Sequence, residues 1–236
     1  LDPAGPERQP GDPDLLKKAA ETLAKAERPM IFVGSGIFLS EAWDEVRELA
    51  DAVQAPGVMS SNGRGALSDR HPLALNSTAG QLLGARADAI LAVGTRFVEP
   101  LTRWGNALPA GAPIIQIDID PEEVGRNGEP TIGIVGDAKL CLAELLAGVD
   151  GANGAGKRPS RADEMAAGKA HVDDLFFEIQ PQAAYTAALR AELPEDGILV
   201  GEMTQVSYFA RNAFPTYLPR THINPGYQGT LGCGFP

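Results

Sequence analysis

The sequence predicts an α/β protein in which a parallel sheet is covered by helices on both faces and is followed by an incomplete second α/β unit. Two observations predict this fold. Short apolar runs rich in β-branched residues alternate with helix patterns from residue 14 to about 147, as in consecutive βαβ units. Within residues 113–137, two such runs end in acidic residues where loops begin, at Asp118 and Asp137. This pattern describes the carboxyl edge of a parallel sheet, where ligands of open α/β sheets bind.

The first domain is expected at residues 14–148, after an extended linker at residues 1–13 that holds four prolines and two glycines. Apolar spacing and Gly/Pro punctuation place its elements. We expect helices at residues 14–27, 40–54, 81–86 and 138–146, and strands at residues 30–33, 58–60, 89–93, 114–117 and 131–135. Residues 121–123, Pro-Glu-Glu, suit the first turn of a further short helix.

A second unit is expected at residues 180–236, after an interdomain linker at residues 149–179 that begins glycine-rich and is helical in part. The pattern predicts a helix at 182–193, a buried strand at 198–200, an exit loop at 201–205, a helix at 206–212 and a glycine-rich loop at 221–236. Domains do not normally stop on such a loop, because its backbone polar groups need neighbours. We therefore expect the chain to be a fragment.

Composition narrows the function classes. The formal net charge of −11 argues against a general nucleic-acid binder. No apolar run is long enough to cross a bilayer and no signal peptide is visible, so a soluble, cytoplasmic protein without a membrane partner is expected. Cys141 and Cys233 are expected to be buried free thiols. The three histidines are scattered without ligand spacing, so they predict no metal site.

Loops after the predicted strands carry residues that suit a nucleotide. Gly34 and Gly36 could let backbone N–H groups approach a phosphate, but the third glycine of the dinucleotide fingerprint is absent and a plain tight turn is favoured. Arg64 and Arg96 could hold phosphate oxygens, and ion pairs with nearby acids explain them equally well.

Two acids end the strand at residues 114–117. Asp118 and Asp120 could accept hydrogen bonds from ribose hydroxyls, or they could cap a helix or a turn. Their spacing alone shows no role in proton transfer.

The second unit carries a different set of candidates. Thr204 and Gln205 precede a helix, where hydroxyl, amide and free N–H groups suit a diphosphate; an ordinary Thr N-cap is the simpler interpretation. The loop at 226–234 could bring backbone close to a flat ring, or it could simply need positive φ angles. Leu231 is the one bulky apolar residue within its GTLGCG core.

Ordered segments covering nearly the whole chain resemble one family. They are RPMIFVGSGIFLSEAWDEVRELADAV, GRGALSDRHPL, ADAILAVGTRF, IIQIDIDPEEVGRN and IVGDA, then QP, GILVGEMTQ and GTLGCGFP. They are similar to thiamine diphosphate (ThDP) enzymes of the acetolactate synthase and benzoylformate decarboxylase group. The resemblance implies a Rossmann-like central domain at about 12–150 and the start of the diphosphate-binding domain from about 180.

The resemblance also implies site roles. Thr204 and Gln205 stand where the family contacts the cofactor diphosphate. Gly229 would offer its carbonyl to the 4′-amino group of the aminopyrimidine and Leu231 its N–H to the ring. Leu231, the one residue here with a catalytic role, would also force ThDP into its bent conformation, which makes proton removal from the thiazolium intramolecular. The substrate would be a 2-keto acid, and the active site would lie between subunits of a homodimer or homotetramer.

Departures from the family pattern limit what the chain can do alone. The activating glutamate belongs to a pyrimidine-binding domain that is missing, and the Gly-Asp-Gly…Asn magnesium motif normally follows GTLGCGFP. We therefore expect ThDP and Mg²⁺ in the full-length protein and no activity from this polypeptide alone. In acetolactate synthases the central domain also binds FAD, and Gly34, Gly36, Arg96, Asp118 and Asp120 fit that role. The segment from His71 to Ala89 lacks their Gly-Met-His-Gly element, which argues against bound FAD.

Three hypotheses therefore remain open. The first is a fragment of a ThDP-dependent 2-keto acid carboligase or decarboxylase, acetolactate synthase-like or, as Glu-Met-Thr-Gln at 202–205 suggests, closer to a benzoylformate decarboxylase-like lyase. The second is a non-catalytic Rossmann-like module that binds FAD or ADP. The third is a scaffolding domain of an oligomer that has lost cofactor binding.

Overall fold

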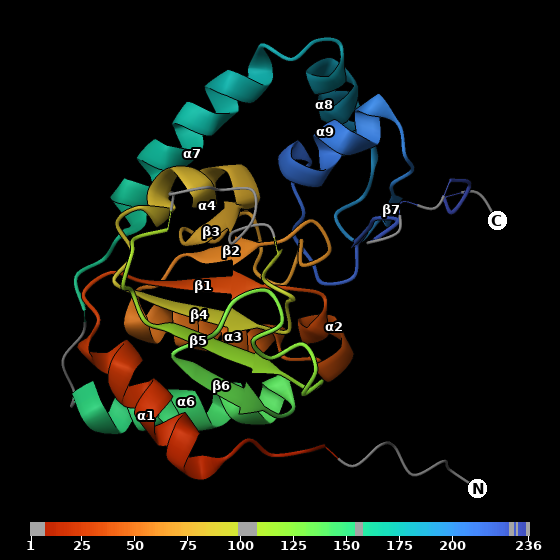
Figure 1. The fold of residues 1–236 in the computed structure, drawn as a ribbon. Helices are drawn as coiled ribbons and strands as arrows, with labels where there is room; N and C mark the ends of the chain where they lie inside the picture. Colours follow the sequence, from red (N-terminus) through yellow and green to blue (C-terminus); the bar gives the residue numbers. More distant parts are fainter. Residues whose placement is uncertain (1–7, 99–107, 154–157, 227–228, 230, 235–236) are drawn as a thin grey trace, which may run out of the picture.

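Six parallel strands form the central sheet of the chain. A computed structural model describes residues 8–98, 108–153, 158–226, 229 and 231–234. The strands are β1 (Pro29–Val33), β2 (Gly57–Met59), β3 (Ala74–Asn76), β4 (Ala89–Val93), β5 (Ile114–Asp118) and β6 (Ile132–Val135). Their order is β3-β2-β1-β4-β5-β6, and every neighbouring pair is parallel (Figure 1). The predicted α/β fold is confirmed.

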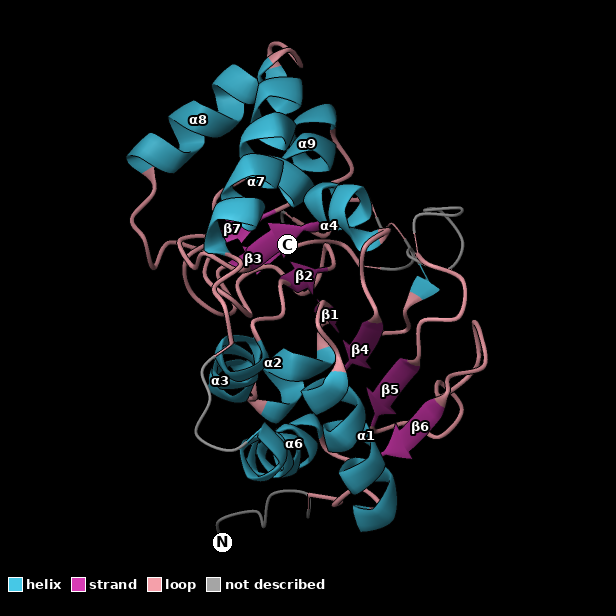
Figure 2. Cartoon of the chain, turned by 90° about the vertical axis from the view of Figure 1, so that its left-hand side faces the viewer, coloured by secondary structure: helices cyan, strands magenta, loops and turns pink. Residues whose placement is uncertain are grey.

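Helices flank this sheet. They are α1 (Pro13–Lys25), α2 (Gly36–Ser40), α3 (Trp43–Val53), α4 (Ser77–Gly84), α6 (Ala138–Asn153) and α7 (Ala162–Phe177). Helices α1, α3 and α6 pack together beside one face, and α4 lies on the other side of the sheet (Figure 2). Both β1 and β4 are buried along their whole length, as a sheet covered on both faces requires. The core lies between these layers.

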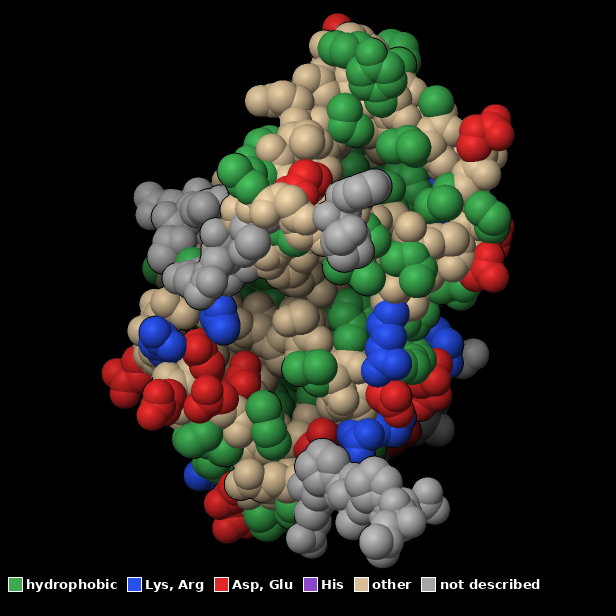
Figure 3. Space-filling model, turned by 90° about the vertical axis from the view of Figure 1, so that its right-hand side faces the viewer, with side chains coloured by type: hydrophobic (Ala, Val, Ile, Leu, Met, Phe, Trp, Pro, Cys, Tyr) green, Lys and Arg blue, Asp and Glu red, His purple; other side chains and the backbone are tan. Residues whose placement is uncertain are grey.

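The second unit is small and lies beside the β2–β3 end of the sheet (Figure 1). It contains α8 (Gln182–Glu192), α9 (Gln205–Ala213) and two short strands, β7 (Leu199–Val200) and β8 (His222–Ile223). The two strands are parallel and pair Leu199 with His222. Large apolar side chains are exposed on this unit, and they gather over the upper part of Figure 3; they include Tyr185, Leu189, Ile198, Val200 and Tyr208.

In the first domain one expected helix begins later than predicted, and one expected helix start is wrong. The helix expected at residues 40–54 is present as α3, which begins at Trp43; Ser40 instead ends α2, because Glu41 adopts a left-handed conformation (φ 57°). The turn at residues 121–123 does not open a helix. It is held instead by the side chains of Asp118 and Asp120, which accept hydrogen bonds from the N–H groups of Asp120 and Glu122 at 3.1 and 2.9 Å.

Further differences concern the later part of the chain. Helix α6 continues to Asn153, further than expected, and α7 at residues 162–177 matches the expectation that the linker is helical in part. The strand predicted at 198–200 is not buried, since 44% of Val200 is exposed. Strands β3 and β8 were not predicted. Cys141 is a buried free thiol as expected, whereas Cys233 is exposed. The domain boundaries at residues 148 and 180 stay predictions.

Helix length and hydropathy also bear on the membrane question. None of the helices in the described part of the chain is long and apolar enough to cross a bilayer.

Candidate functional site

The exit loops of β1 and β4 meet where the strand order reverses, the place where open α/β sheets bind ligands. Three glycines pack backbone against backbone there. Gly34 N donates to Val93 O at 3.2 Å, and Gly36 N donates to Gly94 O at 3.0 Å. A Cβ on Gly36 would lie 2.6 Å from Gly94 Cα, so no side chain fits. The N–H groups of Gly34 and Gly36 are therefore bonded within the protein, which matches the tight-turn interpretation of these glycines.

A charged cluster occupies the neighbouring exits of β4 and β5. Arg96 Nε lies 3.5 Å from Glu123 Oε1, and Arg126 Nη1 lies 2.8 Å from the same oxygen. Glu123 is 8% exposed, and its Oε2 has no hydrogen-bond partner. Burial raises the pKa of the Asp118 carboxyl above its ordinary value, and the Glu123 charge raises it further. Sequence reasoning missed Glu123 and Arg126, whose i,i+3 spacing is the signal that could have found them.

Arg64 forms the ion pair that was the alternative interpretation of this residue. Its side chain is 3% exposed, and Nη2 donates to Asp69 Oδ2 at 2.5 Å and to Phe214 O at 2.8 Å. Asp69 Oδ2 also accepts a hydrogen bond from Thr216 N at 2.7 Å. Arg64 thus joins the loop after β2 to the segment after α9. Atoms Nε and Nη1 of Arg64 are buried without a hydrogen-bond partner.

A cavity of about 260 Å³ lies at this junction. Charged and amide side chains line much of it, namely those of Arg64, Asp69, Arg70, Asn76, Lys169, Asp173 and Asn212. Burial lowers the pKa of the Lys169 ammonium and raises that of the Asp173 carboxyl. Thr204 and Gln205 do not line it, so the cavity is separate from the predicted diphosphate contacts.

The exit loop of β7 leads into α9 with its polar groups at the surface. Thr204 is the N-cap of α9, and its Oγ1 accepts a hydrogen bond from Ser207 N at 3.3 Å. The side chains of Thr204 and Gln205 are both exposed. The predicted cap is therefore present, and it leaves the hydroxyl proton and the Gln205 amide available to a ligand.

The glycine loop, here residues 229 and 231–234, lies against the β7 exit loop. A Cβ on Gly229 (φ 59°) would lie 3.1 Å from Met203 Cε. Gly234 N donates to Glu202 Oε2 at 3.1 Å, and Met203 N donates to Glu202 Oε1 at 2.9 Å. Leu231 is 77% exposed. Gly229, one of the loop residues expected to contact ThDP, therefore lies beside Met203, which directly precedes the N-cap of α9.

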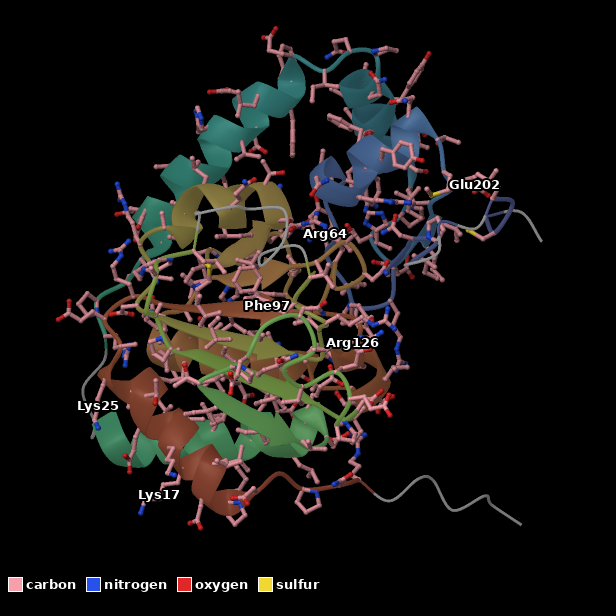
Figure 4. All side chains as sticks on the ribbon, in the orientation of Figure 1. Lys17, Lys25, Arg64, Phe97, Arg126 and Glu202 are labelled. Carbon is pink, nitrogen blue, oxygen red and sulfur yellow. The ribbon has the colours of Figure 1, made fainter. Side chains whose placement is uncertain are left out.

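The two sets of candidates are apart in space. Glu202 of the second unit lies well away from Phe97 and Arg126 of the central sheet edge (Figure 4). Glu202 was not singled out from the sequence, because only the folded chain brings it to Gly234. Among the described residues, no group of three His, Cys, Asp or Glu side chains could hold a metal ion.

Comparison with known proteins identifies the family. Residues 16–145 match the family described as thiamine pyrophosphate enzyme, central domain. This stretch covers more than half of the chain and contains the six-stranded sheet. The chain therefore belongs to the family of thiamine pyrophosphate (ThDP) enzymes.

Individual relatives agree with this assignment. The chain is 32% identical over 96% of its length to a probable acetolactate synthase large subunit of Methanocaldococcus jannaschii, covering 41% of that protein. It is 32% identical over 94% of its length to a probable 2-ketoarginine decarboxylase of Pseudomonas aeruginosa, covering 40% of that protein. It is 30% identical to a sulfoacetaldehyde acetyltransferase of Roseovarius nubinhibens over 98% of its length, covering 43% of that protein. The chain thus spans about two fifths of the length of these relatives.

Proposed function

We propose that the chain supplies the diphosphate-side half of a ThDP site in a 2-keto acid carboligase or decarboxylase. The observation that carries the proposal is the contact between the glycine loop and the β7 exit loop. Gly229 lies against Met203, the residue before Thr204. This proximity supports the proposal that one ligand reaches Gly229 and Leu231 on the loop and Thr204 and Gln205 at the start of α9.

The start of α9 has the donors that a diphosphate needs. The first N–H groups of a helix lack intrahelical partners, and the helix dipole adds positive potential there. Thr204 Oγ1 uses a lone pair for Ser207 N, so its proton is free to donate to a phosphate oxygen. The exposed Gln205 amide adds two further donors.

The glycine loop fits the organic part of the cofactor. Gly229 and Gly232 have positive φ angles, which bring backbone to the surface without side chains. Between them Leu231 exposes a bulky apolar side chain, which is costly in water unless a ligand covers it. We assign the Gly229 carbonyl and the Leu231 N–H to the aminopyrimidine and the Leu231 side chain to the bend between the rings. Bound ThDP supplies a thiazolium that accepts the electrons released when a 2-keto acid loses CO₂.

The remaining parts of the proposal concern the whole protein. Mg²⁺ accompanies the diphosphate, with no ligand assigned among the described residues. The substrate is a small 2-keto acid, and the protein acts as a cytoplasmic homodimer or homotetramer. The exposed apolar side chains of the second unit support an oligomer, since such patches mark protein–protein interfaces.

Calorimetry with ThDP and Mg²⁺ on this chain tests the proposal. We expect saturable binding that weakens about tenfold in Gln205→Ala, because a hydrogen bond to a charged group is lost. Gln81→Ala, which removes an exposed amide from α4, should bind as the unaltered chain does. No heat of binding, or equal affinity of both variants, would overturn the assignment. The chain alone should not turn over keto acids, and measurable turnover would contradict that expectation.

Two alternatives rest on particular observations. Gly34 and Gly36 follow β1 at the reversal of strand order, and Arg96, Asp118 and Asp120 follow the neighbouring strands β4 and β5, which supports the hypothesis of an FAD- or ADP-binding module. Calorimetry with each nucleotide tests it, and Arg96→Ala should weaken binding. Similarity to a probable 2-ketoarginine decarboxylase supports the lyase hypothesis instead. Product analysis of the full-length protein separates ligation from decarboxylation.

A further inference from the structure

We propose that Glu202 is a positioning residue that fixes the glycine loop against the start of α9, so that the two sets of cofactor contacts keep the spacing of one ThDP molecule. This inference rests on the proposed function. It adds a residue that neither the sequence motifs nor the family resemblance assigned.

One carboxylate makes the connection. Glu202 Oε1 accepts Met203 N at 2.9 Å and Oε2 accepts Gly234 N at 3.1 Å. The N–H of Glu202 in turn donates to Ser207 Oγ at 2.8 Å in the first turns of α9. The residue thus contacts β7's exit loop, α9 and the glycine loop at the same time, and Gly234 lies 32 positions along the chain from it.

The charge state of Glu202 suits this role. Hydrogen bonds from the backbone N–H groups of Met203, Gly234 and Gly232 lower the pKa of its carboxyl, so it is ionised at neutral pH. A carboxylate that accepts several N–H groups is an acceptor only, and its two oxygens hold two segments in a fixed relation.

Among the described residues of the glycine loop, Glu202 makes the hydrogen bonds that join the loop to the start of α9. Leu231 is largely exposed, and a Cβ on Gly232 would meet no atom within 4 Å. Within the part of the loop that the structure describes, Gly229 lies close to Met203, Gly234 lies close to Gly201 and Glu202, and Cys233 Sγ lies 3.9 Å from Gly201 O. Loss of the carboxylate would therefore weaken the attachment of the loop while leaving α9 and its Thr204 cap in place.

The test compares two ligands in the unaltered chain, Glu202→Ala and Glu202→Gln, with Asp196→Ala as the control that removes an exposed carboxylate from the same unit. Inorganic diphosphate contacts only the α9 side, whereas ThDP spans both sides. We expect Glu202→Ala to bind ThDP about tenfold more weakly and diphosphate with unchanged affinity, since charge-assisted hydrogen bonds to the loop are lost. Glu202→Gln, which keeps one acceptor oxygen, should lose less, and Asp196→Ala should lose nothing.

Amide hydrogen exchange without ligand gives an independent readout. Gly232 and Gly234 should exchange faster in Glu202→Ala than in the unaltered chain. Equal exchange rates, or an equal loss of affinity for ThDP and diphosphate, would overturn the positioning role. Failure of the unaltered chain to bind ThDP would instead overturn the proposed function, and the exchange rates would still decide the role of Glu202.

Discussion

Acidification should destabilise the fold through one buried histidine, His222. Its side chain is 4% exposed and packs edge-on against Phe214 with ring centroids 5.8 Å apart. Its Nδ1 lies 3.3 Å from Thr216 Oγ1, and its Nε2 has no hydrogen-bond partner. Burial, with smaller contributions from the Arg64 and Arg211 charges, lowers the pKa of His222 from 6.5 to about 4.

The direction in which stability changes with pH follows from proton binding by the folded and unfolded chains. Between pH 6.5 and 4 the unfolded chain takes up a proton on His222 and the folded chain does not, so folding is favoured above pH 6.5 and this advantage is lost as the pH falls. A difference of 2.5 pKa units corresponds to about 3 kcal/mol, of which about 2 kcal/mol should be lost by pH 5.

Urea unfolding at pH 7.5 and pH 5 measures this loss. His222→Gln, which does not titrate, should lose about 2 kcal/mol less between the two pH values than the unaltered chain. His171→Gln removes an exposed histidine and should leave the pH dependence unchanged. If His222→Gln and the unaltered chain lose stability in parallel, His222 is not held neutral by burial, and the reasoning fails.

Three further changes test the packing. Arg158 donates to the terminal carbonyls of α1 and to Val53 O of α3, so Arg158→Met should lower the free energy of unfolding by about 2–3 kcal/mol in urea titrations, and Arg158→Lys by less. Gly36→Ala should lower the free energy of unfolding by about 2–3 kcal/mol, because its Cβ would meet the Gly94 backbone at 2.6 Å. Gly151→Ala, in an open position of α6, should raise it by about 0.5–1 kcal/mol, and thermal unfolding measures both changes. Arg64→Met should cost about 3 kcal/mol, and a double-mutant cycle with Asp69→Asn should show that the two effects are not additive.

The sequence predicts best the strands that are buried on both faces of the sheet, because burial makes them continuous apolar runs. Strands β1, β4 and β5 are short, mostly apolar runs entered from turn or loop residues, a pattern typical of strands buried in a parallel sheet. Strand β3 has three residues, too few to show any period, and it is defined by its pairing with β2. The end of α2 at Glu41 could not be predicted either, since glutamate has no preference for the left-handed conformation that it adopts. Such features depend on tertiary neighbours.

In the candidate site, too, the roles of single residues that depend on tertiary neighbours could not be predicted from the sequence. The N-cap at Thr204 was predicted because helix starts have a local signature. Glu202 was missed because its function depends on Gly234, which a sequence pattern does not connect to it. Likewise, Arg64 could be a phosphate ligand or an ion-pair partner until Asp69 and Phe214 O are seen beside it.

The two predicted ligand sites differ in how they use glycine, and this difference favours the second unit as the place where the chain binds a cofactor. At Gly34 and Gly36 the backbone of Gly94 fills the space that a side chain would need. The N–H groups of Gly34 and Gly36 are hydrogen-bonded within the protein. Gly229 and Gly232 have positive φ angles, and the side chain of Leu231 between them is exposed. Apolar surface and free donors at a helix start remain available there, so a ligand gains more from the second unit than from the closed turn at β1.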